Sequence, residues 1–181
     1  MTGLLAILDA HDVRYIVTGS VAALLFSVKV DPGDLDVTPA GDRANLERLA
    51  QALEELQARQ YPDEPFGRWT VGEDAERRWV EFEPTDADRK ARAVWRPDPG
   101  DIASFDHLLQ TRLGTLDVVP EIAGRYEQLR DRAVPVEVEG RAVWVESVAD
   151  QLATLTVPRR DKDRDRVHRL REIQRLAKGH S

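Results

Sequence analysis

Apolar and polar positions in the first sixty residues alternate with periods that predict five elements. Leucines at residues 4–8 predict a short amphipathic helix, and the β-branched and aromatic run at 14–18 predicts a strand. The apolar run at 21–26 predicts a buried helix, and the alternation at 34–38 predicts a second strand. Leucines three and four apart from Leu46 to Leu56 predict a longer helix, capped by Asp42 and ending near Gln60.

The last eighty residues show a second regular pattern. A hairpin is expected from 105–112 and 115–119, and another from 134–139 and 142–145, each around a glycine. Helices are expected at 123–132, from a capping Ser147 onward, and after Pro158. The final helix has an apolar stripe of Val167, Leu170, Ile173, Leu176 and Ala177.

Residues 61–100 are rich in Pro, Gly, Asp, Glu and Arg and lack a clear period. Short strand-like runs stand at 68–71, 79–83 and 93–95. This pattern predicts irregular structure with edge strands.

Composition narrows the class of protein. With 181 residues, 41% of them hydrophobic and 33% charged, the chain is long enough for one globular domain, with or without a small appendage. No run of eighteen apolar residues is present, so we expect neither a membrane span nor a signal peptide. The absence of cysteine excludes disulfides, a thiol nucleophile and thiolate metal ligands, and fits a reducing, cytoplasmic compartment.

The net charge of −7 hides an asymmetry between two parts of the chain. Residues 159–178 contain nine basic and four acidic residues, a local charge of +5, so the remainder carries −12. The overall sign argues against a phosphate-rich partner, whereas the basic segment does not.

Asp34 and Asp36 are the carboxylates whose sequence neighbours indicate a metal-binding pair. A D-x-D pattern occurs four times in the chain, but only this one flanks a leucine on an expected apolar strand. Two partly buried carboxylates on one strand face repel each other unless a cation neutralises them, and magnesium prefers such oxygen ligands. The pairs Glu81/Glu83 and Glu137/Glu139 are more consistent with exposed faces of edge strands.

Gly19 and Ser20 stand between the first strand and the second helix. Glycine permits close backbone approach, while helix amides and a serine hydroxyl donate to phosphate. The alternative is an ordinary helix N-cap, a position in which serine is common.

Taken in order, these features resemble the nucleotidyltransferase superfamily of the DNA polymerase β type. Gly19-Ser20 matches its first motif, Asp34 and Asp36 its metal-binding pair, and Asp117, alone on a later strand, its third carboxylate. The C-terminal half, from Gly114 onward, is similar to AbiEii-type and MenT-like bacterial nucleotidyltransferases. Several of those proteins are toxins of toxin–antitoxin pairs.

The resemblance implies an α/β (α+β) fold, with a mixed sheet flanked by helices and a C-terminal helical segment. It places a nucleotidyltransferase core at residues 1–145 and a helical extension at 146–181. It also implies transfer of a nucleoside monophosphate from a nucleoside triphosphate such as ATP to an acceptor hydroxyl. Asp34, Asp36 and Asp117 are then the catalytic, metal-binding residues for two Mg²⁺ ions, with Asp117 accepting the acceptor's proton.

The same resemblance assigns nucleotide binding to Gly19, Ser20 and Lys29, and to Arg160 and Lys162 in the basic segment. For Lys29 the alternative is an ordinary surface lysine, and for the basic segment a solvated, salt-bridged helix face.

Two cationic positions depart from the family pattern. Residues 29–33 replace an arginine and a threonine that often precede the metal pair, and Leu155-Thr156-Val157 stands where a lysine often lies.

Three functions therefore remain open. The first is a toxin that modifies tRNA and has a cognate antitoxin protein. The second is a transferase acting on a small hydroxylated acceptor of the aminoglycoside type, which the acidic body favours. The third is a degenerate nucleotide-binding or antitoxin module without activity.

Overall fold

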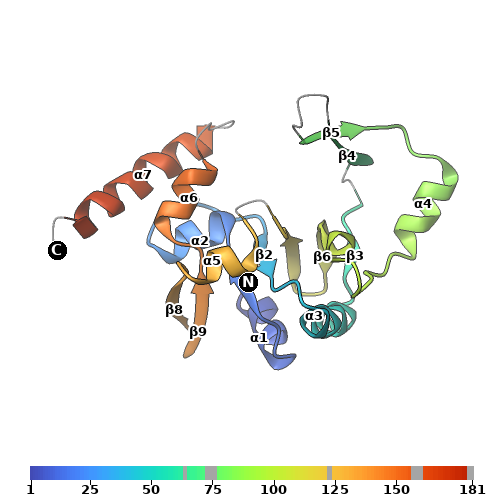
Figure 1. The fold of residues 1–181 in the computed structure, drawn as a ribbon, viewed down its shortest axis with the longest axis horizontal. Coiled ribbons are helices and arrows are strands. Elements are labelled where there is room, and N and C mark those ends of the chain that lie inside the picture. Colours follow the sequence, from blue (N-terminus) through green and yellow to red (C-terminus); the bar gives the residue numbers. More distant parts are fainter. Residues whose placement is uncertain (63–64, 72–76, 122–123, 156–160, 179–181) are drawn as a thin grey trace.

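The computed structural model describes residues 1–62, 65–71, 77–121, 124–155 and 161–178. Within these residues the chain forms a mixed α/β structure around one seven-stranded sheet, with a separate two-stranded sheet at its periphery (Figure 1). The large sheet contains β1 (Tyr15–Val17), β2 (Leu35–Pro39), β3 (Arg59–Gln60), β6 (His107–Thr111), β7 (Gly114–Val118), β8 (Val134–Val138) and β9 (Arg141–Val145). The small one pairs β4 (Gly67–Val71) with β5 (Arg77–Glu81).

The helices are α1 (Thr2–Ala10), α2 (Gly19–Leu25), α3 (Arg43–Glu55), α4 (Asp86–Ala93), α5 (Tyr126–Arg130), α6 (Val148–Thr154) and α7 (Asp161–Lys178), with a 3₁₀ turn at Ile102–Phe105. The strand order of the large sheet is β3-β6-β7-β2-β1-β9-β8. The pairs β2–β7 and β1–β9 are parallel, and the other neighbours are antiparallel. A mixed sheet flanked by helices, as the sequence predicts, is confirmed.

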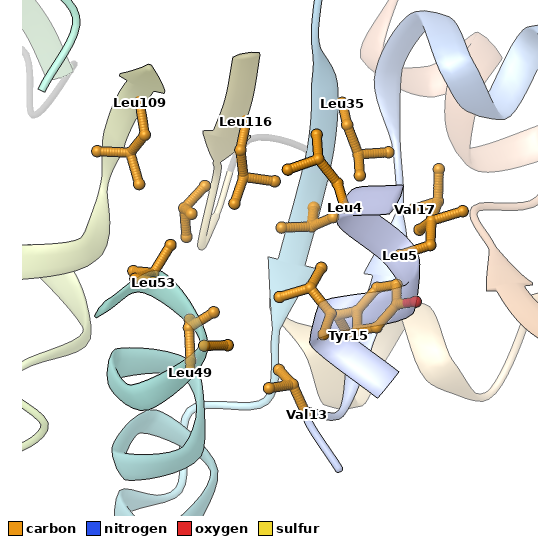
Figure 2. Packing of buried hydrophobic residues seen from close by; sticks show 14 of the residues in the cluster. Leu4, Leu5, Val13, Tyr15, Val17, Leu35, Leu49, Leu53, Leu109 and Leu116 are labelled. Carbon is orange, nitrogen blue, oxygen red and sulfur yellow. The ribbon is translucent and has the colours of Figure 1, made fainter. Parts of the chain in front are cut away.

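The main core lies between one face of this sheet and helices α1 and α3. Leucines of α1 and α3 meet the strand side chains there, as Figure 2 shows for Leu4, Leu49 and Leu116. The periodic leucines that define both helices in the sequence are the ones that are buried. Removal of this apolar surface from water is the main stabilisation of the fold.

A second, smaller apolar cluster joins α2, α6 and α7. Its buried members are Ala23, Val28 and Leu170, with α6 side chains packed around them. The predicted stripe of α7 is therefore only partly a core face: Val167 and Leu170 are buried, but Leu176 is 64% exposed. The division of the chain at residue 145 stays a prediction.

Two helix predictions need correction. Helix α3 begins at the Asp42 cap, whose side chain accepts from the Asn45 backbone N–H, but it ends at Glu55 rather than near Gln60. Gln57 adopts a left-handed conformation (φ 53°), and Arg59–Gln60 then pairs with β6 as a strand. Helix α5 covers only Tyr126–Arg130 of the predicted 123–132, and residues 122–123 lie outside the description.

Residues 61–100 are more regular than predicted. Strands β4 and β5 match two of the expected strand runs, but the run at 93–95 is not a strand. Helix α4 occupies 86–93 because Thr85 and Asp88 form a reciprocal capping box, with acidic residues in the first turn and basic ones in the last. Trp95 then packs edge-on against His107 and joins this segment to the sheet.

Both hairpins of the C-terminal half are confirmed as β6–β7 and β8–β9, and Ser147 caps α6 by accepting from the Asp150 backbone N–H. Among the helices that the structure describes, none combines the length and apolarity needed to cross a bilayer.

Asn45 is a buried polar residue on which the sheet and α3 both depend. Its Oδ1 accepts from the Arg14 backbone N–H at 2.7 Å, and its Nδ2 donates to the Arg14 and Ala40 carbonyls at 3.0 and 2.9 Å. Asn45→Ala is expected to lower the free energy of unfolding by about 2–4 kcal/mol, because buried backbone groups lose their partners. Urea denaturation measures this change.

The matched control is Gln51→Ala, an exposed position of the same helix, with an expected effect within about 0.5 kcal/mol. Equal effects of the two substitutions would show that the Asn45 bonds do not stabilise the fold.

Candidate active site

Asp34, Asp36 and Asp117 converge at one point of the sheet. Asp36 lies in β2 and Asp117 in β7, and the two are direct register partners of the parallel pair. Asp34 precedes Asp36 by two residues and projects to the same side. One carboxylate oxygen from each of the three lies within 4.8 Å of the others, as the sequence predicts for a metal triad.

Strand alternation explains why these carboxylates lie away from the main core. Leu35 and Val37 of β2, like Leu116 and Val118 of β7, are buried in the core on one face of the sheet. Asp36 and Asp117 occupy the intervening positions and are only partly buried on the opposite face. The hydrophobic pattern thus fixes where the acidic side chains point.

The electrostatics of this cluster favour a bound cation. Burial and the neighbouring Asp34 carboxylate raise the pKa of Asp36 from 3.8 to about 6, against a hydrogen bond from the Ser20 backbone N–H and the charge of Arg166. A hard divalent ion among three carboxylate oxygens would remove this repulsion. Among the residues that the structure describes, this is the cluster that fits a metal ion.

Gly19 allows the first turn of α2 to touch Asp36. It has a left-handed backbone (φ +66°), and a Cβ added there would lie 2.2 Å from Asp36 Oδ2. The Thr18 backbone N–H donates to the Asp36 carbonyl at 3.0 Å, which joins β1 to β2 at this point. Glycine is therefore required by sterics as well as by backbone conformation.

Ser20 is not the N-cap of α2. The helix begins at Gly19 with Thr18 as its N-cap, and no side chain caps it. The alternative interpretation of Ser20 as an ordinary cap is therefore wrong, and Ser20 lines a cavity instead.

The triad opens into a cavity of about 510 Å³. Its lining includes six of the predicted site residues, namely Gly19, Ser20, Lys29, Asp34, Asp36 and Asp117. Arg160 lies outside the described residues, and Lys162 is placed only as part of the α7 backbone. A cavity of about 520 Å³ beside α3 and Trp95 does not contain the triad, so we place the site at the carboxylates.

The cavity lining also contains Glu146, Gln151 and Arg166, which were not predicted from the sequence. Glu146 continues β9 and donates its backbone N–H to the Val17 carbonyl at 2.8 Å, so its side chain lies beside Gly19. Arg166 reaches the cavity from α7. Arg166 lies three residues after the buried Asp163 and four before the buried Leu170, so it shares the side of α7 that faces the protein.

Glu146 is a buried acid, only 2% exposed. Burial, followed by the charge of Asp150, raises its pKa to about 7, and a hydrogen bond from the Gly19 backbone N–H opposes this rise. Its place directly after an apolar strand and before a helix cap was the sequence signal. By contrast, Glu81, Glu83, Glu137 and Glu139 are all exposed, as predicted for edge-strand faces.

No protein-family profile matches the sequence, and no curated protein matches it either. Two solved structures are similar in fold over nearly the whole chain. The solution structure of the antibiotic-resistance factor ANT(2'')-Ia is 17% identical, with a TM-score of 0.48 over 98% of this chain and 90% of that one. The crystal structure of ANT(2'')-Ia with adenylyl-2''-tobramycin is 16% identical, with a TM-score of 0.47 over 96% and 94%. Likeness of this degree carries no information on activity.

Gly19→Ala should disrupt the site, because the new Cβ collides with the Asp36 carboxylate in a backbone region that alanine disfavours. The expected cost is about 1–3 kcal/mol of unfolding free energy, together with loss of magnesium-dependent stabilisation. Thermal and urea denaturation with and without MgCl₂ measure both effects. Gly33→Ala is the matched control, since nothing lies within 4 Å of its added Cβ.

Magnesium is expected to stabilise the protein more at pH 7.5 than at pH 5. The raised pKa of Asp36, about 6, means that its contribution to stability is present below about pH 4 and is lost as the pH rises through 6. A cation at the triad offsets that loss only where Asp36 is ionised. At ten times its Kd the ion adds about 1.4 kcal/mol, measured as a shift in Tm.

Asp36→Asn should remove both the magnesium response and this pH dependence, whereas Asp86→Asn in the exposed D-x-D pair should leave both intact. An equal magnesium response in the two variants would contradict the assignment of the triad.

Proposed function

We propose that this protein is a magnesium-dependent nucleotidyltransferase that moves a nucleoside monophosphate from a nucleoside triphosphate to an acceptor hydroxyl. The convergence of Asp34, Asp36 and Asp117 beside the Gly19-Ser20 turn carries the proposal. The three carboxylates would hold two Mg²⁺ ions. Bound there, the ions would neutralise triphosphate charge and lower the pKa of the attacking hydroxyl.

The three aspartates would position the reactants and accept the proton that the reaction releases. The acceptor oxygen attacks the α-phosphorus, the bond from that phosphorus to the bridging oxygen breaks, and pyrophosphate leaves. In our proposal the Asp117 carboxylate accepts the hydroxyl proton, and Asp34 and Asp36 fix the position of the triphosphate. The cavity volume of about 510 Å³ is sufficient for a nucleotide-sized ligand.

In this proposal, Gly19, Ser20 and the basic side chains that line the cavity bind the triphosphate. Without ligand, the backbone N–H groups of Gly19 and Ser20 donate to the carboxylates of Glu146 and Asp36. Ser20 lines the cavity, and its hydroxyl would be a further donor for phosphate oxygens. Lys29 and Arg166 are the cations in the described lining. Lys162 of α7 and Arg160, which lies outside the described residues, remain candidates.

We propose a small, positively charged, hydroxylated molecule as the acceptor. The described lining has seven acidic side chains and two basic ones, a formal charge of −5 when all are ionised. The charges of two magnesium ions and a triphosphate nearly cancel, so the negative charge of the lining remains to be offset by the acceptor. A polyanion such as RNA would add to the repulsion within the cavity.

The second candidate is a tRNA end, modified by a toxin that a cognate antitoxin restrains. One observation favours this candidate: the outer surface of α7 carries exposed arginines. They are Arg164, Arg169, Arg171 and Arg175. Such a face contacts phosphates outside a catalytic cavity. A non-catalytic nucleotide-binding module is less consistent with the triad, because an unneutralised carboxylate cluster is costly to retain.

Incubation of the purified protein with each α-³²P-labelled nucleoside triphosphate, MgCl₂ and either cationic small hydroxylated acceptors or total tRNA tests the proposal. Transfer of label to an acceptor, with release of pyrophosphate, is expected for the wild type. Asp117→Asn is expected to lower the rate at least about 10³-fold, because both metal binding and proton acceptance are lost. Chelation with EDTA should abolish transfer.

The matched control is Asp86→Asn, which should retain the wild-type rate. Transfer that survives Asp117→Asn would exclude the triad as the catalytic centre. Label on tRNA alone would establish the second candidate, and nucleotide binding without any transfer would establish the non-catalytic one.

A further inference from the structure

Two oxygen atoms in the cavity are buried without a partner. Glu146 Oε1 and Gln151 Oε1 accept no hydrogen bond from any residue that the structure describes. Their side chains are 2% and 3% exposed, and both line the cavity that contains the triad. Buried acceptors left unpaired cost free energy, so a ligand that donates to them is expected.

Neither side chain is free to turn away. Gln151 Nε2 donates to the Glu146 backbone carbonyl at 3.1 Å, which fixes the amide so that its oxygen remains available. The Glu146 backbone is held to β1 by its bond to the Val17 carbonyl, and Ser147 caps the helix that carries Gln151. The two acceptors are therefore part of a rigid wall.

The two oxygens are hydrogen-bond acceptors, and one of them belongs to a carboxylate, so they favour a positively charged ligand with N–H donors. Phosphate groups offer acceptors only and are repelled by the Glu146 carboxylate. A further divalent ion needs about six oxygen ligands in a near-regular arrangement, whereas this wall offers two oxygens beside the Gly19 backbone N–H, which is a donor. A protonated primary amine brings one positive charge and three N–H donors on a small group, which suits a carboxylate and an amide oxygen in one cavity wall.

We propose that Glu146 and Gln151 form a subsite for a protonated primary amine carried by the acceptor. This inference rests on the proposed function only in assigning the amine to that acceptor. The Glu146 carboxylate lies close enough to Gly19 and Asp36 to interact with both, so the bound amine holds the acceptor beside the triphosphate. Glu146 is in this sense a specificity residue rather than part of the triad.

An NMR titration with n-propylammonium chloride tests the subsite without any catalysis. The ¹⁵N-labelled protein is titrated at pH 8, where Glu146 is largely ionised, with MgCl₂ present to occupy the triad and with constant ionic strength. Saturable shifts are expected for the Gly19 amide and the Gln151 side-chain amide. Glu146→Gln should weaken the Kd at least tenfold, because a charge-assisted bond is replaced by a neutral one.

Glu146→Gln is suited to this test because the amide has nearly the same shape as the buried carboxylate and removes its charge. The ¹H–¹⁵N spectrum of the free variant shows whether the fold is retained. Glu137→Gln is the matched control: it makes the same chemical change on the exposed edge strand β8 and should retain the wild-type Kd. Equal affinity in Glu146→Gln and the wild type would overturn the subsite, as would equal weakening in both variants.

Two further titrations distinguish hydrogen-bonded binding of an alkylamine from binding of a cation without N–H donors and from binding of the ammonium ion. Tetramethylammonium has the charge but no N–H donors and should not bind; binding as tight as that of propylammonium would overturn hydrogen-bonded recognition. Ammonium chloride should bind more weakly than propylammonium, whose alkyl stem contacts the Leu155 wall. Tighter binding of ammonium would overturn the assignment to an acceptor amine.

The subsite and the proposed function fail in different ways. Asp36→Asn should abolish nucleotidyl transfer but preserve Glu146-dependent amine binding. If no acceptor is ever labelled while propylammonium binds through Glu146, the proposed function fails and the amine subsite stands. If transfer occurs equally well in the wild type and Glu146→Gln with an amine-bearing acceptor, the subsite fails and the transferase stands.

Discussion

The placement of three partly buried carboxylates at one position of the sheet is the constraint on which the rest of the site depends. Parallel pairing of β2 with β7 sets Asp36 directly beside Asp117, and strand alternation adds Asp34 on the same side. The resulting pKa of Asp36 shows that the arrangement opposes ionisation. The core on the other face of the sheet fixes both strands and so holds the carboxylates together. A cation bound there would offset the cost of ionising them.

The strand order explains how a small protein combines this cluster with a stable core. The central strands β7, β2 and β1 present apolar side chains to α1 and α3 on one face, where Figure 2 shows Leu116, Leu35 and Val17. On the other face β2 and β7 carry Asp36 and Asp117. The junction of β1 and α2 then lies against Asp36, where only glycine fits. Helices α6 and α7 complete the opposite wall through their own apolar cluster with α2. One sheet thus separates the core that stabilises the fold from the face that carries the candidate site.

The charge of α7 has a different meaning in the structure than in the sequence. As a segment it is basic, but its cavity side contributes Asp163, Asp165 and Arg166, while several other arginines lie on its exposed surface. The cavity is therefore strongly acidic even where a basic helix borders it. Local potential, and not the net charge of a segment, decides which ligand such a cavity attracts.

The sequence by itself determined the elements with strong periodicity and the identity of the three aspartates, because apolar spacing and flanking residues are local properties. It did not determine the end of α3 or the helix at 86–93, since backbone conformation and capping bonds compete with pattern at those positions. It also did not determine the exposure of Leu176, because an apolar stripe does not show how far along a helix the packing against other elements extends. Only the tertiary structure identified Glu146, Gln151 and Arg166 as cavity residues. Their roles depend on strands and helices far apart in the chain meeting at one point, and no local pattern encodes that proximity.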